Sequence, residues 1–453
     1  MKQDKHTICS APQPTSADVC RWAQALSDLH QRLAPRFARP EPRRRALLYL
    51  QAILSDIPRK NGWQVAEQAR EATPYGMQRL LSQAAWDTDG VRDDVRSYVL
   101  EQLGSEWATL IVDETSFCKR GKHSAGVGLQ YCGTTGQIEN CQVGVFLSYA
   151  SARGHALIDR ELYLPLDWCE DRDRCRAAGI PDTVRFRTKP ELARTMIERI
   201  CAAQIPIGWV VADSVYGGNL DLRTWLEAHH YSYVMGVACD EPVGIHTPDG
   251  VRRRVEASAV EAYLLRTQDW QRLSMSQGTK GPRLFDWAVV PILHRWEDDG
   301  RHWLLIRRCV NDPSIKAFYL VFGPPHTELA VMVKVCGTRW HIEEDFANTK
   351  ELGLDHYEVR GWTAWYRCMT LVLLAYAFLV GMCTQMPTPS RHLPLEAPGL
   401  LFPLTVAEVQ HLLARLIWPS SASVRLVLAW SQFRRRHYGY ASYFHSKRRL
   451  KAG

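Results

Sequence analysis

The chain has 453 residues, of which 46% are hydrophobic and 23% are charged, so it is long enough for about three globular domains. These fractions are ordinary for a globular protein and exclude a wholly disordered, collagen-like or coiled-coil chain. Lys and Arg number 56 against 48 Asp and Glu, a net charge of +8, which permits a nucleic-acid partner without requiring one.

The cysteines and the longest apolar run indicate where the protein works. The thirteen cysteines form no CxxC pair and the N-terminal residues hold no apolar signal segment, which argues against a disulfide framework and secretion. Residues 369–383 are apolar throughout, but this run is short for a membrane span and suits a buried helix. We therefore expect a cytoplasmic protein with no membrane partner.

The N-terminal region is predicted to be helical and basic, because apolar residues recur at helical spacing between residues 43 and 98. Segments 63–69 and 74–84 resemble a helix-turn-helix, in which Thr73 is the N-cap and Pro74 the first helical residue. An ordinary helical bundle explains the same pattern. A true helix-turn-helix would turn one helix face to the major groove of DNA. The candidate DNA contacts of this region are Tyr75, Gln78 and Arg79, together with the basic residues Arg43, Arg44 and Arg45.

After Gly104 the pattern becomes one of strands and helices. The predicted order is strands at 108–113, 127–132 and 141–149, a helix at 189–203, a strand at 209–213, a helix at 220–229 and a strand at 231–237. The turn after the first strand contributes three further candidate DNA contacts, Lys119, Arg120 and Lys122.

Residues 238–335 interrupt this alternation and are predicted to form a β-rich insertion, with strands at 287–292, 303–308 and 317–322. Helices are predicted again at 338–352, 362–381, 406–418 and 423–437. The C-terminal tail is basic and contains aromatic residues, so it is either a solvated tail or a phosphate-contacting arm; the aromatic residues favour the arm. Its candidate DNA contacts are Arg434, Arg435 and Arg436.

Three carboxylates stand out from this pattern. Asp113 and Asp213 each end a predicted apolar strand, and on adjacent strands they could hold a hard cation through oxygen ligands, although many such aspartates only cap a turn. Glu343 shares one face of a predicted helix with Arg339 and Lys350. That face is either a salt-bridged surface or a metal ligand flanked by phosphate-binding cations. Glu344 is turned by about 100° and should point elsewhere.

These residues resemble the DDE transposases of bacterial insertion sequences, specifically the insertion sequence 701 group, which is related to the insertion sequence 4 group. The resemblance covers nearly the whole chain and rests on segments 112–115, 137–146, 159–165, 189–193, 212–217, 337–344 and 353–360. The Tyr-x2-Arg-x3-Glu-x6-Lys signature of that family falls on Cys336, Arg339, Glu343 and Lys350. Cys336 replaces the tyrosine, which places a phosphate contact in doubt but leaves the carboxylates intact.

The resemblance implies an α/β fold, in which an RNase H-like catalytic core is interrupted by a β-rich insertion and flanked by helical N-terminal and C-terminal regions. The implied divisions are a helical DNA-binding domain at 1–104, the core at 105–237 and 336–386, the insertion at 238–335 and a helical region with a basic tail at 387–453.

The resemblance also implies the chemistry. Asp113, Asp213 and Glu343 would be the catalytic, metal-binding triad, and Arg339 and Lys350 would hold phosphates. Hard carboxylate ligands favour Mg²⁺, with Mn²⁺ tolerated. Such an enzyme binds double-stranded DNA as terminal inverted repeats, cleaves it at the element ends and joins the freed 3′-OH to target DNA. We expect a homodimer in the paired-end complex and a bacterial, nucleoid-associated location in the cytoplasm.

Two other functions fit the same residues. One is an RNase H-like DNA nuclease that lacks strand transfer, and only a strand-joining assay separates it from a transposase. The other is a catalytically inactive DNA-binding descendant of a transposase, against which the intact Asp113, Asp213 and Glu343 argue.

Overall fold

The computed structural model describes residues 13–278, 281–386, 403–419 and 423–452. The chain divides into two compact units. One, the helical unit, comprises residues 1–95 and 348–453, and the other, the sheet unit, comprises residues 96–347. Each unit has its own core and is described by itself.

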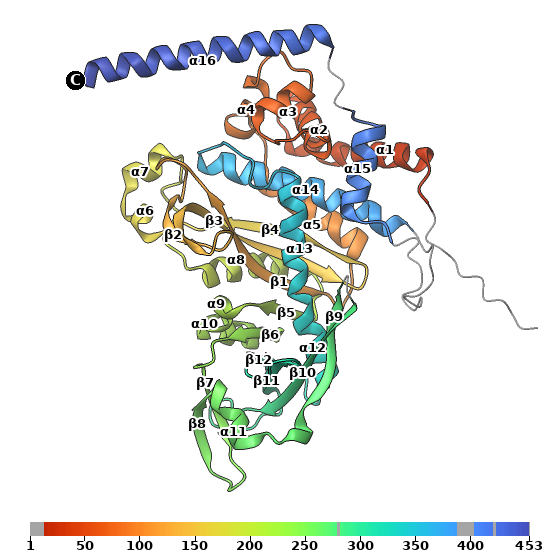
Figure 1. Cartoon of the computed structure of the whole chain (residues 1–453), viewed down its shortest axis with the longest axis vertical. Coiled ribbons are helices and arrows are strands. Elements are labelled where there is room, and N and C mark those ends of the chain that lie inside the picture. Colours follow the sequence, from red (N-terminus) through yellow and green to blue (C-terminus); the bar gives the residue numbers. More distant parts are fainter. Residues whose placement is uncertain (1–12, 279–280, 387–402, 420–422, 453) are drawn as a thin grey trace, which may run out of the picture. The chain divides into compact units, whose positions relative to one another are not determined.

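The described part of the sheet unit forms a ten-stranded mixed sheet in the order β2-β3-β1-β5-β6-β12-β11-β10-β9, with β4 paired to β3 (Figure 1). Its strands are β1 (Thr109–Cys118), β2 (Gly128–Cys132), β3 (Gln137–Ser151), β4 (Gly154–Leu162), β5 (Trp209–Ala212), β6 (Ser232–Val237), β9 (Gln271–Gly278), β10 (Gly281–Pro291), β11 (His302–Cys309) and β12 (Lys316–Phe322). A separate hairpin joins β7 (Pro242–His246) to β8 (Arg252–Glu256).

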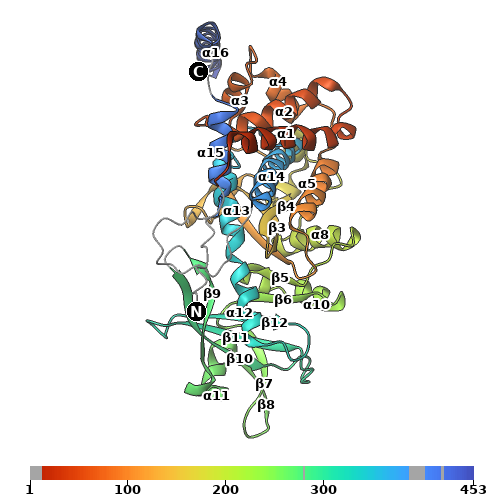
Figure 2. The ribbon, with the colours of Figure 1, turned by 90° about the vertical axis from the view of Figure 1, so that its right-hand side faces the viewer.

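The first half of the sheet combines antiparallel and parallel pairing. β1 is antiparallel to β3 and parallel to β5, and β5 is parallel to β6. All four residues of β5 are buried, as expected for a short apolar strand covered on both faces. Figure 2 shows α8 (Lys189–Ala202) and α10 (Leu220–Ala228) on one face of this region and α12 (Leu329–Thr338) on the other.

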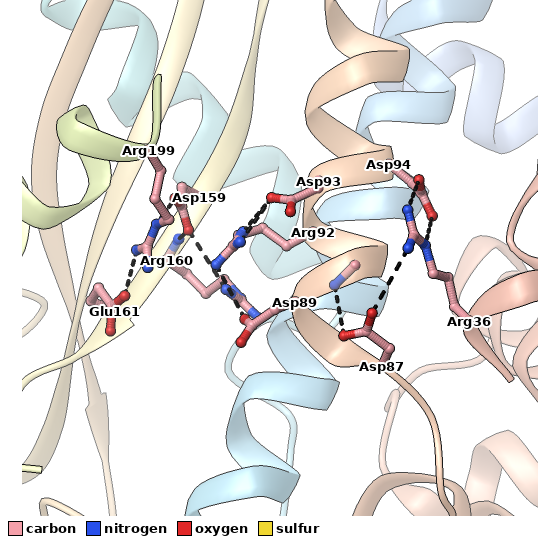
Figure 3. A network of polar contacts seen from close by, with 11 residues as sticks. Arg36, Asp87, Asp89, Arg92, Asp93, Asp94, Asp159, Arg160, Glu161 and Arg199 are labelled. Atoms are coloured by element: carbon pink, nitrogen blue, oxygen red, sulfur yellow. Dashed lines mark hydrogen bonds and ion pairs between the residues drawn. The ribbon is translucent and has the colours of Figure 1, made fainter. Parts of the chain in front are cut away.

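One strand of this region was not predicted. β4 contains two charged residues, Asp159 and Arg160, that are 0% exposed. Its sequence therefore lacks the apolar pattern from which a buried strand is predicted. Arg199 of α8 pairs with Asp159, with Nε 2.9 Å from Asp159 Oδ2, and makes a second contact to Glu161 (Figure 3). A buried carboxylate is tolerated only with such a partner, and that partner lies 40 residues away in the sequence.

The strands predicted between residues 238 and 335 are confirmed as β10, β11 and β12. β12 pairs antiparallel with β6 and so continues the sheet. Trp287 is fully buried and packs with Trp209 and Val333. The tryptophan therefore contributes to the hydrophobic core.

The helical unit is built around α14 (Trp362–Gln385). This is the one helix among the described residues that is long and apolar enough to cross a membrane, and 83% of its apolar window is buried inside the protein. It packs against α2, α4 and α15, which confirms the buried helix expected for residues 369–383. The other helices are α1 (Ser16–Arg32), α2 (Pro40–Leu54), α3 (Gly62–Gln68), α4 (Tyr75–Ser82), α15 (Val406–Leu416) and α16 (Val424–Ala452), while α5 (Thr88–Leu103) runs between the units in sequence.

Two predictions about this unit are wrong in detail. Pro74, and not Thr73, is the N-cap of α4, and no side chain caps that helix. The predicted helix at 423–437 does not end there, since α16 continues to Ala452. The residues that follow His437 include no proline, so no proline terminates the helix.

Candidate active site

The pairing of β1 with β5 brings the two aspartates together. The parallel register matches Val112 with Ala212, so Asp113 and Asp213 follow at the same level. Asp213 is the N-cap of α9 (Ser214–Gly217) and accepts a hydrogen bond from the Val215 backbone amide at 2.9 Å. The two residues therefore share the point where β5 ends.

Asp113 does not end its strand, contrary to the sequence prediction. β1 continues to Cys118 because its antiparallel pairing with β3 extends as far as Cys141. β1 therefore pairs with β3 along its whole length, whereas its pairing with β5 stops at Val112, just before Asp113. This position is more rigid than the strand end that we expected.

Burial and the nearby charge of Asp213 raise the pKa of Asp113 to about 7. Burial and the charge of Glu114 likewise raise the pKa of Asp213. Both shifts mark carboxylates crowded together away from water, where their charged forms are disfavoured. A cation at this point would relieve that crowding.

Glu343 reaches the same site from α13 (Trp340–Glu351). The guanidinium of Arg339 connects the two, with Nη1 3.1 Å from Asp113 Oδ2 and Nη2 3.7 Å from Glu343 Oε1. Arg339 therefore links Glu343 to Asp113, and Asp113 lies beside Asp213.

The donor set fits a hard divalent cation, because it offers carboxylate oxygens only. In the described residues, three groups of His, Cys, Asp and Glu side chains have their ligand atoms within 4.8 Å of one another. The set of Asp113, Asp213 and Glu343 is not one of these three groups. The positive charge of Arg339 lies beside Asp113 and Glu343. Carboxylates crowded together beside a guanidinium are the features expected of a site that takes up metal.

Sequence reasoning missed Glu114, which lies beside both aspartates. Lys189 Nζ of α8 lies 2.6 Å from Glu114 Oε1, and the buried Tyr216 hydroxyl of α9 donates to Oε2 at 2.5 Å. The segments 189–193 and 212–217 carried the family resemblance, and their convergence on this carboxylate explains why both matter. Predicting that Lys189 and Tyr216 meet at Glu114 requires the order of the strands in the sheet, which the spacing of residues in the sequence does not give.

Glu344 points away from the site, as the helical rotation predicts. Its Oε2 lies 3.2 Å from Nε2 of His155 on β4. His155 Nδ1 is also 2.6 Å from the fully buried Asp345. Burial opposes the charge on His155, but Asp345 and Glu344 outweigh it and raise its pKa to about 10. Glu344 thus belongs to an ion pair between α13 and β4.

Cys336 packs inside the protein. It is 4% exposed and lies in the cluster formed by Trp209, Trp287 and Val333. Its thiol faces the Tyr319 hydroxyl. The side chain at this position therefore packs in the hydrophobic core that α12 covers.

The predicted DNA contacts fall into three groups. Arg45 and Arg434 are already engaged, by Glu71 and Glu67 respectively, each at 2.7 Å. Arg43, Lys119 and Lys350 are half-buried, and Lys350 lies two turns beyond Glu343 on α13. The exposed members are Arg44, Gln78, Arg79, Arg120, Lys122, Arg435 and Arg436.

The comparisons with known proteins agree with the chemistry of this site. The family model described as DDE superfamily endonuclease matches residues 32–282, more than half of the chain. The match includes Asp113 and Asp213 and ends before Glu343.

A protein of Microchaete diplosiphon, described as a probable transposase for insertion sequence element IS701, is 26% identical over 311 residues, which are 67% of this chain and 75% of that protein. Among solved structures, the piggyBac transposase synaptic complex with hairpin DNA aligns over 82% of this chain and 71% of its own, at 10% identity and a TM-score of 0.39. The NurA nuclease from Sulfolobus solfataricus aligns over 56% of this chain and 83% of its own, at 7% identity and a TM-score of 0.24.

Proposed function

Since the chain belongs to the DDE superfamily of endonucleases, we propose that it binds the terminal inverted repeats of its own element, cleaves DNA at the element ends and joins the freed 3′-OH to target DNA. The predicted kinship with DDE transposases of the insertion sequence 701 type is confirmed by the family match and by the transposase relative. The steps of end recognition, cleavage and strand transfer are our proposal.

The fold supports an RNase H-like core. The strands β4-β3-β1-β5-β6 follow one another in the sheet, with an antiparallel first half and β5 and β6 parallel to β1. We assign this core to residues 105–237 and 336–386. The strands between residues 238 and 335 form the proposed insertion, and residues 1–104 and 387–453 form the helical flanks.

One observation carries the proposal. The β1–β5 register sets Asp113 beside Asp213, and Arg339 contacts both Asp113 and Glu343. Three carboxylates from two strands and one helix thus meet beside a guanidinium. A phosphate-cleaving site needs hard ligands for cations and a cationic group for the substrate phosphate.

We assign Asp113, Asp213 and Glu343 as the ligands of Mg²⁺, or of Mn²⁺ in its place. When bound, the metal activates the attacking oxygen and stabilises charge on the leaving oxygen of the phosphodiester. Arg339 presents a planar fork suited to a phosphate. Glu114 is fixed by Lys189 and Tyr216, which holds the strand beside Asp113 in place.

The DNA would be held by exposed cations and by the amide of Gln78. Arg44, Gln78 and Arg79 of the helical unit, Arg120 and Lys122 after β1, and Arg435 and Arg436 of α16 are open to solvent. Two protomers, one for each element end, would form the paired-end complex. A cytoplasmic, nucleoid-associated location follows from that role.

The test is an incubation of the purified chain and Mg²⁺ with the DNA that flanks its gene, in which cut ends are mapped and joined products are sought. Asp113→Asn is the inactive control. Metal-dependent cuts at inverted repeats, joined to a second DNA, would support the proposal. Cutting without joining would favour the nuclease, and binding without cutting would favour an inactive descendant.

A matched pair of variants checks the assignment on α13. Glu343→Gln should lower cleavage by about 100-fold or more, since a bound metal contributes several kcal/mol to such a reaction, and should leave DNA binding intact. Glu344→Gln keeps Glu343 in place and should retain cleavage. Equal losses in the two variants would contradict the helix-face assignment.

A further inference from the structure

Glu227, His294 and His302 form a second cluster of potential metal ligands, which the proposed function does not use. Glu227 lies near the end of α10, His294 follows β10 and His302 begins β11. Their ligand atoms all lie within 4.8 Å of one another. We propose that this His-His-Glu cluster is a zinc site.

The spacing of the ligand atoms fits a shared ion. His302 Nε2 lies 3.3 Å from Glu227 Oε1, and His294 Nε2 lies 3.9 Å from Glu227 Oε2. Both distances exceed those of ordinary hydrogen bonds between such groups, about 2.7–3.2 Å. Ligands around a tetrahedral zinc ion, with bonds of about 2.0–2.2 Å, stand roughly 3.3–3.5 Å apart.

His302 supplies the independent sign of a ligand. The residue is 7% exposed, and its Nε2 has no hydrogen-bond partner within the described residues. Its other nitrogen, Nδ1, lies 2.8 Å from Asp299 Oδ2. Nε2, on the other side of the ring, faces the Glu227 carboxylate. A buried imidazole nitrogen that has no hydrogen-bond partner and faces a carboxylate is a position at which a metal ion can bind.

The groups around the cluster hold its ligands in position. The Tyr233 hydroxyl donates to Glu227 Oε1 at 2.7 Å, and Asp299 orients His302. Carboxylate–histidine pairs and hydrogen-bonded carboxylates of this kind are the usual support of metal ligands. His294 stacks on His302 with ring centroids 4.2 Å apart and planes 11° apart. Two of the three ligand side chains, Glu227 and His302, are therefore held by hydrogen bonds from neighbouring groups.

The turn that carries His294 is strained. Arg295 and Trp296 both adopt left-handed conformations, with φ of 50° and 68°, in a tight turn closed by hydrogen bonds between His294 and Glu297. Two consecutive positions of this kind are normally filled by glycine or asparagine. Trp296 is 48% exposed, so its burial does not offset the strain. Strain kept in such a turn is often associated with a binding site.

The donor chemistry selects the metal. Two imidazole nitrogens and one carboxylate oxygen suit zinc, whereas magnesium prefers oxygen ligands throughout. The cluster is thus chemically distinct from the carboxylate site at Asp113. A zinc ion here would tie the end of α10, the strained turn and β11 together, with a fourth position open to water or to a further ligand.

The test uses the full-length chain, stripped of metal with a chelator and titrated with Co²⁺ as an optical probe and with Zn²⁺. The wild-type chain should bind one more metal ion per chain than either His294→Gln or Glu227→Gln. The visible absorption bands of tetrahedral Co²⁺ should be lost in both variants. His411→Gln, at an exposed histidine of α15, is the matched control and should equal the wild type. The difference in bound metal between the wild type and each variant excludes ions that bind elsewhere in the chain, because these bind equally in both.

Asp299→Asn provides a graded test, because loss of a supporting carboxylate typically weakens metal affinity by about 10–100-fold. His294 is half-buried, so His294→Gln decides the question if substitution at the buried His302 prevents folding. Equal equivalents and identical spectra in the wild type, His294→Gln and Glu227→Gln would overturn the proposal and leave the cluster as an ion pair. None of these readouts depends on DNA cleavage.

Discussion

The guanidinium of Arg339 lies 3.1 Å from the carboxylate of Asp113. The same side chain reaches Glu343 at 3.7 Å, so the residue expected to grip phosphate also balances the acids that are expected to bind metal. A cation that shares carboxylates with a metal competes with it for their charge. Arg339 therefore has two opposing effects, and they can be separated.

We predict that Arg339→Ala tightens metal binding by the DNA-free protein while slowing DNA cleavage. Removal of a unit charge near two carboxylates changes the local energy by up to about 4 kcal/mol at an effective dielectric constant of 20, so a gain of at least about tenfold in Mn²⁺ affinity is expected. Calorimetric titration with Mn²⁺ and a strand-cleavage assay measure the two effects. Arg153→Ala, at an exposed residue of the sheet unit, should change neither. A parallel fall in metal affinity and cleavage would mean that Arg339 holds the carboxylates in place.

Tyr216→Phe should destabilise the sheet unit. The buried Tyr216 hydroxyl donates to Glu114, and burial together with that carboxylate raises its pKa well above the ordinary value, so it remains a donor at all moderate pH values. The variant leaves one buried carboxylate oxygen short of a donor, which costs about 1–3 kcal/mol. Urea unfolding measures the loss. Tyr263→Phe, at a residue 43% exposed, should unfold as the wild type does, and equal stability of both variants would contradict the role assigned to Tyr216.

Local signals in the sequence predicted much of the site. The apolar run before Asp213 predicted β5, and the helix at 189–203 begins where Thr188 and Glu191 cap each other. Such features depend on neighbouring residues. The spacing on α13 also separated Glu343 from Glu344 correctly.

The missing parts depended on contacts between distant segments. β4 was missed because Asp159 pairs with the distant Arg199, and Glu114 was missed because Lys189 and Tyr216 come from two other elements. Lys60 is likewise held by a contact that its charge alone does not predict, since it is 5% exposed and donates to the Ser55 carbonyl. A charged residue in the sequence indicates that the folded protein must supply a partner for it, but it does not show which residue that partner is.

Lys60 makes the stability of the helical unit depend on pH. Burial lowers its pKa from 10.5 to about 8. Between these two values the unfolded chain binds a proton that the folded chain does not, so the free energy of unfolding rises with pH through this window. The full contribution is roughly 3 kcal/mol.

We therefore predict that the wild type gains stability relative to Lys60→Met as the pH rises from 7.5 to 10. Chemical unfolding of both proteins at the two pH values measures the difference, and the other titrating groups cancel between them. Arg59→Met, at the exposed neighbouring residue, should show no such change. A constant difference between wild type and Lys60→Met would mean that the ammonium stays charged in the folded protein.

Three consecutive arginine residues of the basic helix α16 differ in their surroundings: one pairs with a carboxylate, and two are exposed. Its first turns contact α3, since Trp430 Nε1 donates to the Glu71 carbonyl at 3.0 Å and Arg434 lies 2.7 Å from Glu67. Arg435 and Arg436 are exposed. Neighbours in sequence therefore have different tasks, and substitution distinguishes them.

Replacing both Arg435 and Arg436 with alanine should weaken DNA binding without changing the melting temperature. Each lost phosphate contact lowers the slope of log affinity against log salt by about 1. Arg434→Ala should leave that slope unchanged and cost at most about 1 kcal/mol of stability, as a partly exposed ion pair does. Affinity measured over a range of salt concentrations, beside thermal melts, tests both statements. An unchanged slope in the double variant would assign α16 to packing alone, and the DNA would then have to be held by the exposed cations of α2, α4 and the loop after β1.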